Sequence, residues 1–233
     1  MHPDITDFHW EIIDKVKPYT MTSIERIIAV IDATLFIVEN DIEGDIVECG
    51  VWRGGSMMAI AYTLMYLNEQ KRNLYLFDTY EGMIEPNEKD KRYDGKQASD
   101  WFDQYKNDKE TGSDWCFAGL QDVERNLYLT GYQKNKLHFI KGKVEDTLLE
   151  DKNIPNTISI LRLDTDLYDS TKLEFVKLYP SVSKGGIVLI DDYGHWQGAK
   201  LATDEYLSTL AAKPFLNRID YTCRSFQKTA DAS

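Results

Sequence analysis

The sequence is poor in cysteine and histidine, has no long apolar run and carries no excess of basic residues. Its three cysteines, Cys49, Cys116 and Cys223, are odd in number, far apart and without a C-x-x-C pair. This pattern excludes a disulfide framework and a thiolate zinc site, and it favours a reduced, cytoplasmic protein. Without an H-E-x-x-H pattern, a metal site would have to rely mainly on carboxylates.

Two further absences exclude classes of location and partner. No run of roughly 18 apolar residues exists, and the N-terminus lacks a basic stretch followed by an apolar one, so neither a membrane span nor a signal peptide is expected. Asp and Glu number 39 against 27 Lys and Arg, which gives a formal charge of −12. Such a chain is repelled by phosphate backbones and anionic lipids, so we expect neither nucleic acid nor membrane as a partner.

Short apolar runs alternate with helical patterns along the 233 residues, which suffice for one α/β domain with a cap. The runs are 46–49, 74–77, 137–140, 158–163 and 187–190. Their alternation predicts a mostly parallel sheet with helices on both faces. Ser23 begins an amphipathic helix, and 217–220 with 225–228 are expected to form a terminal antiparallel pair. We divide the chain into an N-terminal helical cap, 1–43, and a main domain, 44–233.

Two segments suggest contacts beyond this core. Residues 82–119 are polar with scattered aromatics and are too long for an ordinary loop, so we interpret them as a surface insertion or as a lid over an active site. Trp10, Ile13 and Val16 share one face of an N-terminal helix that could pack on a partner subunit, which is consistent with a homo-oligomer.

A glycine turn, E-x-G-x-x-x-G, connects the run that contains Glu48 to the helix that begins near Ser56. It matches neither G-x-G-x-x-G nor the P-loop, yet glycines and a helix N-terminus allow close approach of a ligand. Asp78 ends the next strand, where an acid can accept hydrogen bonds from ribose hydroxyls. An ordinary βα turn and an N-cap aspartate are the alternatives that involve no ligand.

Two apolar strands end in paired carboxylates, Asp164 with Asp166 and Asp191 with Asp192. The carboxyl ends of parallel strands share one edge, so these four groups should converge there. A bare cluster would repel itself, and a hard cation such as Mg²⁺ or Ca²⁺ would relieve the repulsion. The alternative is that the aspartates only cap helices and form turns.

The most specific blocks of sequence occur in order and at matching intervals between about residues 18 and 228. They are 44–55 (GDIVECGVWRGG), 78–82 (DTYEG), 161–171 (LRLDTDLYDST), 178–180 (LYP), 185–186 (GG), 190–194 (IDDYG) and 218–220 (RID). The chain thereby resembles the TylF/macrocin family of S-adenosylmethionine-dependent O-methyltransferases, which act on sugar hydroxyls of antibiotics. The resemblance implies a Rossmann-like class I methyltransferase fold with a seven-stranded sheet, and a Mg²⁺-dependent reaction.

The resemblance also implies roles for individual residues. Those expected to bind S-adenosylmethionine are Thr20, Met21, Glu48, Gly50, Val51, Trp52, Arg53, Ser56, Asp78, Gly142 and Asp164. Asp164, Asp191 and Asp192 are expected to hold the metal, with Asp166 as the general base. Asp164 and Asp166 could exchange these roles, and His195 is a second candidate base.

The acceptor is less defined than the chemistry. This chain has Thr79-Tyr80 and Thr165 where many relatives have Ser-Phe and Gly, and its 82–119 segment shares little with the antibiotic enzymes. A sugar of a glycosylated natural product and another vicinal diol, such as a catechol, both fit metal chelation. A nicotinamide-dependent oxidoreductase and a non-catalytic nucleoside-binding protein are the alternative functions.

Overall fold

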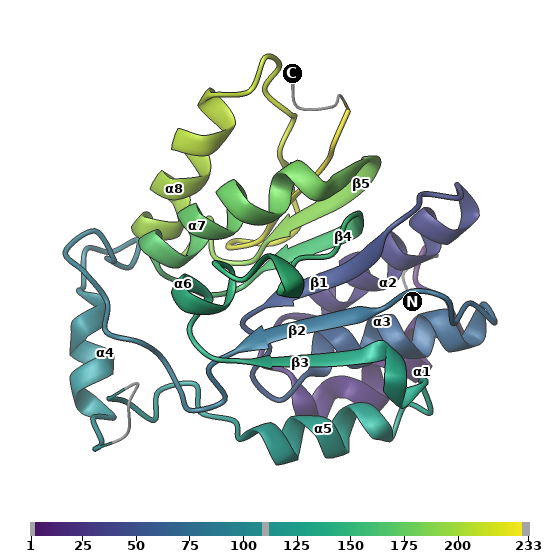
Figure 1. The fold of residues 1–233 in the computed structure, drawn as a ribbon, viewed down its shortest axis with the longest axis horizontal. Helices are drawn as coiled ribbons and strands as arrows, with labels where there is room; N and C mark the ends of the chain where they lie inside the picture. The colour runs from purple at the N-terminus through teal and green to yellow at the C-terminus, as the bar shows by residue number, and fades with distance from the viewer. Residues whose placement is uncertain (1–2, 109–111, 230–233) are drawn as a thin grey trace.

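The computed structural model describes residues 3–108 and 112–229, and within them one seven-stranded sheet forms the centre of the molecule (Figure 1). The strands run in the order β3-β2-β1-β4-β5-β7-β6. Their bounds are β1 Asp45–Cys49, β2 Leu74–Asp78, β3 Leu137–Lys141, β4 Ile158–Leu163, β5 Val182–Ile190, β6 Asn217–Arg218 and β7 Arg224–Gln227. The first five are parallel, whereas β7 runs antiparallel to β5 and β6. The predicted class I methyltransferase topology is confirmed.

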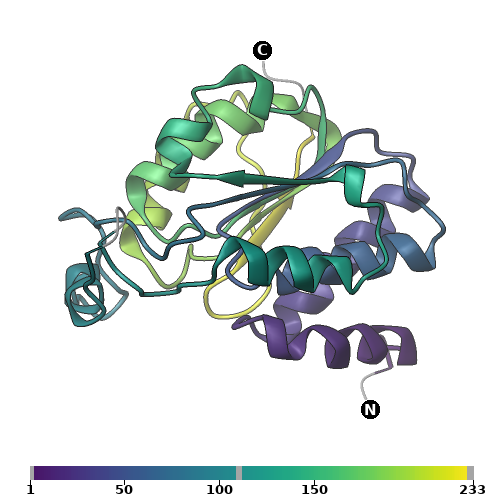
Figure 2. The same cartoon turned by 60° about the horizontal axis from the view of Figure 1, so that its bottom comes forward.

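Helices cover both faces of this sheet (Figures 1 and 2). The helices are α1 Asp7–Val16, α2 Ile24–Glu39, α3 Gly55–Tyr66, α4 Ala98–Gln104, α5 Leu120–Tyr128, α6 Val144–Thr147, α7 Tyr168–Leu178 and α8 Gln197–Ser208. One layer contains α1, α2, α3 and α5, and the other contains α6, α7 and α8. The described residues include no helix with both the length and the apolar character that crossing a bilayer requires.

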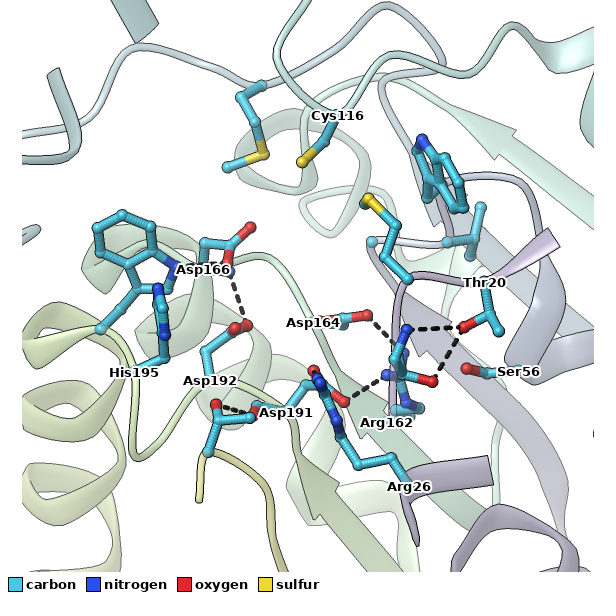
Figure 3. A pocket seen from close by; sticks show the side chains of 18 of the residues that line it. Thr20, Arg26, Ser56, Cys116, Arg162, Asp164, Asp166, Asp191, Asp192 and His195 are labelled. Atoms are coloured by element: carbon cyan, nitrogen blue, oxygen red, sulfur yellow. Dashed lines mark hydrogen bonds and ion pairs between the residues drawn. The ribbon is translucent and has the colours of Figure 1, made fainter. Parts of the chain in front are cut away.

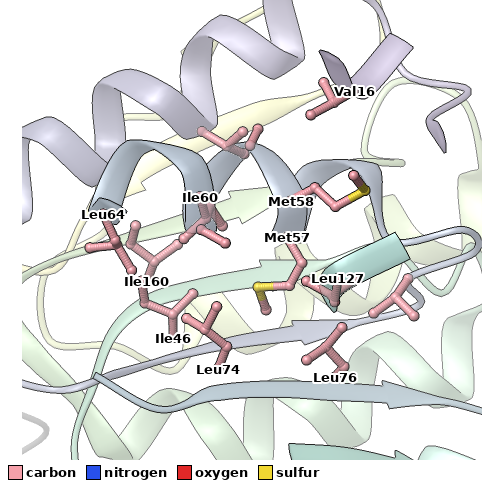
Figure 4. Packing of buried hydrophobic residues seen from close by; sticks show 14 of the residues in the cluster. Val16, Ile46, Met57, Met58, Ile60, Leu64, Leu74, Leu76, Leu127 and Ile160 are labelled. Atoms are coloured by element: carbon pink, nitrogen blue, oxygen red, sulfur yellow. The ribbon is translucent and has the colours of Figure 1, made fainter. Parts of the chain in front are cut away.

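Helix α3 lies at the centre of the first layer and is apolar on nearly all sides. Its side chains Met57 and Ile60 are fully buried, and Figure 4 shows them above Ile46 of β1 and Leu74 of β2. A helix can be apolar all round only when other elements enclose it, and here α1 and α2 cover its outer side. The helix that follows the glycine turn is therefore held rigidly against the sheet.

The N-terminal helices share this core. Ile13 and Val16 of α1 are buried in the same cluster as α3, whereas Trp10 is 36% exposed. The expectation that one face with Trp10, Ile13 and Val16 packs on a partner is thus wrong for the two aliphatic residues, which pack within their own chain. The division into a 1–43 cap and a 44–233 domain stays an interpretation of the sequence.

Strand β5 is longer than the apolar run 187–190 predicts, since it begins at Val182. Gly185 and Gly186 resemble a turn in the sequence, but the structure keeps them in the strand next to β7. Gly185 has a φ of +87°, and a Cβ there would lie 2.7 Å from Ile42 Cδ1. The left-handed backbone explains why a glycine stands inside a strand.

The described parts of segment 82–119 lie on the side of the sheet to which the arrows of β2 and β3 point, and they include α4 (Figure 1). Backbone hydrogen bonds attach them to the loop after β5: Tyr93 N–H donates to the carbonyl of His195 at 2.8 Å, and Gln197 N–H donates to Lys91 at 2.7 Å. Three tryptophans pack together across this junction, Trp101 and Trp115 from the segment and Trp196 from the loop.

Candidate active site

A cavity of about 340 Å³ opens at the carboxyl ends of the parallel strands. Its walls are the segment before α2, the glycine turn, the ends of β2, β4 and β5, and the 82–119 segment (Figure 3). Ligands of open parallel sheets bind at this edge. The expected site residues at the cavity wall are Thr20, Met21, Gly50, Val51, Trp52, Ser56, Asp78, Asp164, Asp166, Asp191, Asp192 and His195.

The glycine turn has a backbone that only glycine accommodates at its first position. Gly50 has a φ of +77°, and a Cβ there would lie 2.0 Å from the carbonyl oxygen of Asp164. Asp78 closes the turn, because its Oδ2 accepts hydrogen bonds from the N–H groups of Val51 at 2.8 Å and Trp52 at 3.2 Å. Its Oδ1 accepts the N–H of Tyr80 at 2.7 Å, and the hydroxyl of Thr79 lies 3.5 Å from the same oxygen. A carboxylate has about four acceptor positions, so three backbone N–H groups leave Asp78 about one position, on Oδ1, for a ribose hydroxyl.

Three of the residues expected to contact the cofactor lie elsewhere. Gly142 lines a smaller neighbouring cavity of about 60 Å³ that also contains Asp78. Glu48 and Arg53 are not part of either cavity wall. Glu48 is buried behind the turn and pairs with Arg162 at 2.6 Å, while Arg53 pairs with Asp122 at 2.7 Å and donates to the carbonyl of Pro18 at 2.9 Å. These contacts hold the turn and the segment before α2 in place.

The predicted convergence of the strand-end carboxylates is present. Asp164, Asp191 and Asp192 each offer an oxygen atom, and the three atoms lie within 4.8 Å of one another. Burial, together with neighbouring carboxylates, raises the pKa of Asp164 and of Asp192 well above the usual range. The donor set therefore fits a hard divalent cation, which favours oxygen ligands and would offset the excess negative charge.

Asp166 stands beside this trio. Its backbone N–H donates to Asp192 Oδ2 at 3.1 Å, and its Oδ1 accepts a hydrogen bond from the indole N–H of Trp196 at 2.6 Å (Figure 3). Burial and the charge of Asp164 raise the pKa of Asp166 to about 7. Asp166 also has a φ of +65°, which is uncommon outside glycine and is a form of strain that concentrates at functional sites.

The geometry of this edge can be compared with known proteins. The family model of macrocin-O-methyltransferase (TylF) matches residues 13–228 of the chain. The chain belongs to this family. It is 30% identical over 212 residues to the demethyldecarbamoylnovobiocin O-methyltransferase of Streptomyces niveus, a match that covers 91% of this chain and 76% of the relative. It is 26% identical to the mycinamicin III 3''-O-methyltransferase of Micromonospora griseorubida, over 75% of this chain and 65% of the relative.

A solved structure agrees with the family. The O-methyltransferase NovP superimposes with a TM-score of 0.77 at 29% identity, over 91% of this chain and 83% of NovP. The calicheamicin methyltransferase CalS11 shares the fold, with a TM-score of 0.66 at 16% identity over 97% of this chain and 93% of CalS11. The protein is therefore an S-adenosylmethionine-dependent O-methyltransferase, and the oxidoreductase and non-catalytic alternatives are set aside.

Two arginines of this macrocin-type methyltransferase were missed by the sequence analysis. Arg162 in β4 is 2% exposed and pairs with Glu48 and Asp164 at 2.6 Å each, and with Asp191. Arg26 of α2 pairs with Asp191 and, at 3.0 Å, with Asp220. The sequence did contain an indication of the role of Arg162. It is the arginine of the apolar run 158–163, and a charged side chain in a strand covered on both faces needs carboxylate partners.

The second candidate base, His195, also reaches the methyltransferase cavity. Its Nδ1 lies 3.0 Å from the hydroxyl of Tyr221, and burial together with the charge of Arg92 lowers the pKa of its imidazole. His195 therefore favours the neutral form that a general base requires. Asp166 has the closer connection to the carboxylate trio, through Asp192.

Proposed function

We propose that the enzyme methylates a hydroxyl of a sugar, or of another vicinal-diol natural product, in a reaction that depends on Mg²⁺. The observation that carries this proposal is the carboxylate trio of Asp164, Asp191 and Asp192, which shares one cavity with the glycine turn. The named relatives support a sugar acceptor, because they include a methyltransferase for a rhamnosyl tetracenomycin from Streptomyces olivaceus, 27% identical over 91% of this chain.

The two cavities suggest an arrangement for S-adenosylmethionine. Gly50 and Ser56 would approach the methionine end, Asp78 would accept hydrogen bonds from the ribose, and Gly142 would border the adenine. Thr20 and Met21 would cover the bound cofactor from the segment before α2. Glu48 and Arg53 would then act on the cofactor indirectly, by holding the turn.

The chemistry needs alignment and a stronger nucleophile, since the sulfonium of S-adenosylmethionine is already a good leaving group. Asp164, Asp191 and Asp192 would hold the Mg²⁺ ion, whose charge would make the acceptor hydroxyl more acidic. Asp166 would accept the hydroxyl proton at its carboxylate while Trp196 fixes the orientation of that carboxylate. Trp101 and Trp115 line the cavity, where their indoles would exclude water from a bound acceptor.

Asp192→Asn tests the metal dependence, because asparagine removes the negative charge but keeps an oxygen that can accept the Asp166 N–H. Asp191 is a poorer target, because its removal would leave Arg162 with fewer partners. We expect Asp192→Asn to lower the rate of S-adenosylhomocysteine release about 100-fold, since metal charge stabilisation contributes several kcal/mol. Binding of S-adenosylhomocysteine, measured by calorimetry, should stay within about threefold of the wild type because the cofactor contacts remain.

Exposed Asp146 provides the matched control, and Asp146→Asn should leave turnover unchanged. Full turnover of the wild type in chelator would refute the metal dependence. A panel of glycosides and catechols tests the acceptor class. If S-adenosylhomocysteine were released only in the presence of catechols, a sugar acceptor would be refuted. A cytoplasmic location and a homo-oligomer stay predictions from the sequence.

A further inference from the structure

Arg26 places a fixed positive charge inside the carboxylate cluster. It stands in the first turn of α2, directly after the segment that lines the cavity, and its side chain is 15% exposed. Its guanidinium donates from Nη1 to Asp191, and its Nε forms an ion pair with Asp220 Oδ2, 3.0 Å away, without the alignment of a hydrogen bond. Arg26 therefore connects the N-terminal helices to the end of β5.

Asp191 already has a guanidinium at each of its carboxylate oxygens. Arg162 donates to Oδ1 and Arg26 donates to Oδ2, as seen beside Asp191 in Figure 3. Asp191 is also one of the three carboxylates whose oxygens converge within 4.8 Å. A divalent cation bound by this trio would have to share the oxygens of Asp191 with two positive side chains.

The two arginines differ in how easily each could move away from Asp191 when a metal binds. Arg162 is fully buried and pairs with Glu48 and Asp164 as well as Asp191, so its removal would leave buried carboxylates without compensation. Arg26 lines the cavity and has Asp220 as a second partner. Asp220 is itself fixed, because it accepts hydrogen bonds from Ser23 Oγ at 2.9 Å and from the N–H of Cys223 at 2.7 Å.

We propose that Arg26 is a tethered counter-ion: a positioning residue that holds Asp191 in the metal-free enzyme and competes with a divalent metal for Asp191 Oδ2. The proposal rests on the metal site of the proposed function. Asp220 keeps the Arg26 side chain in place when Oδ2 turns to a metal. Because the competing charges are a few ångströms apart in a partly buried site, the repulsion lowers metal affinity substantially.

The affinity of the full-length, metal-free protein for Mn²⁺, measured by isothermal titration calorimetry, tests this competition. Arg26→Gln should bind Mn²⁺ at least about tenfold more tightly than the wild type, because a neighbouring positive charge is removed. Arg26→Lys keeps the charge and should stay within about threefold of the wild type. Arg92 also lines the cavity but pairs with Asp94, so Arg92→Gln is the matched control and should change the Mn²⁺ affinity less than about twofold.

Thermal unfolding adds a second readout. Metal-free Arg26→Gln should melt at a lower temperature than the wild type, as the loss of any structural ion pair would cause. Mn²⁺ should raise its melting temperature more than that of the wild type, which a purely structural role would not produce. Unchanged or weaker Mn²⁺ binding by Arg26→Gln, in protein that still binds S-adenosylhomocysteine, would overturn the inference alone. Absence of Mn²⁺ binding in the wild type and all three variants would overturn the metal site as well.

Discussion

Replacing Trp196 by phenylalanine would test whether its indole orients the base. Trp196 is 4% exposed, and its ring lies 5.7 Å from the ring centroids of both Trp101 and Trp115. Phenylalanine keeps an aromatic ring in this cluster but removes the N–H that donates to Asp166 Oδ1 at 2.6 Å. The substitution thus separates the hydrogen bond from most of the packing.

The size of the effect follows from the hydrogen bond to a charged acceptor. Such a bond contributes about 1.5–3 kcal/mol, which corresponds to a fall in kcat of about 10- to 150-fold if Asp166 acts in the rate-limiting step. The affinity for S-adenosylhomocysteine should stay within about twofold, because the glycine turn is unchanged. The assay is S-adenosylhomocysteine release at saturating methyl donor and acceptor, with calorimetry for cofactor binding.

Trp101→Phe is the matched control, since it removes an indole N–H from the same aromatic cluster and leaves the Trp196–Asp166 bond intact. Its effect should fall on KM for the acceptor more than on kcat. A kcat of Trp196→Phe within twofold of the wild type, in folded protein, would refute the role of the indole and weaken the assignment of Asp166 as base.

Three further predictions concern the turn, a buried acid and the metal. Gly50→Ala should abolish cofactor binding in calorimetry, because its Cβ would lie 2.0 Å from a carbonyl oxygen. Glu174 is fully buried, and burial raises its pKa from 4.5 to about 8. The folded state then binds more protons than the unfolded state, so the stability of the wild type falls as pH rises between these values. Between pH 5 and pH 8 this group should cost the wild type at most about 3.5 kcal/mol of unfolding free energy, and denaturant titrations at the two pH values should show that Glu174→Gln removes this loss. Chelator should halt turnover and Mg²⁺ restore it, whereas recovery without added metal would contradict the metal dependence.

The sheet and the meeting of the aspartates were predictable from the sequence. Apolar runs bounded by glycines and helical patterns specify buried parallel strands, and parallel strands deliver their carboxyl ends to one edge. Asp164 and Asp191 could therefore be placed together although they stand on different strands. The longer β5 was missed because Gly185 in a strand has the same local signature as a turn.

The charge balance of the site was decided only by the tertiary structure. Periodicity reports whether a residue is buried, but it does not report which distant group will neutralise it. Arg26 reaches Asp191 across 165 residues, and Arg162 lies between Glu48 and Asp191 because β4 separates β1 from β5. The position of Trp196 against Asp166 likewise depends on the docking of 82–119 onto the loop after β5. The amino-acid pattern by itself determined that carboxylates gather at this edge, and the packing of helices and insertion around them decided which cations and donors hold them there.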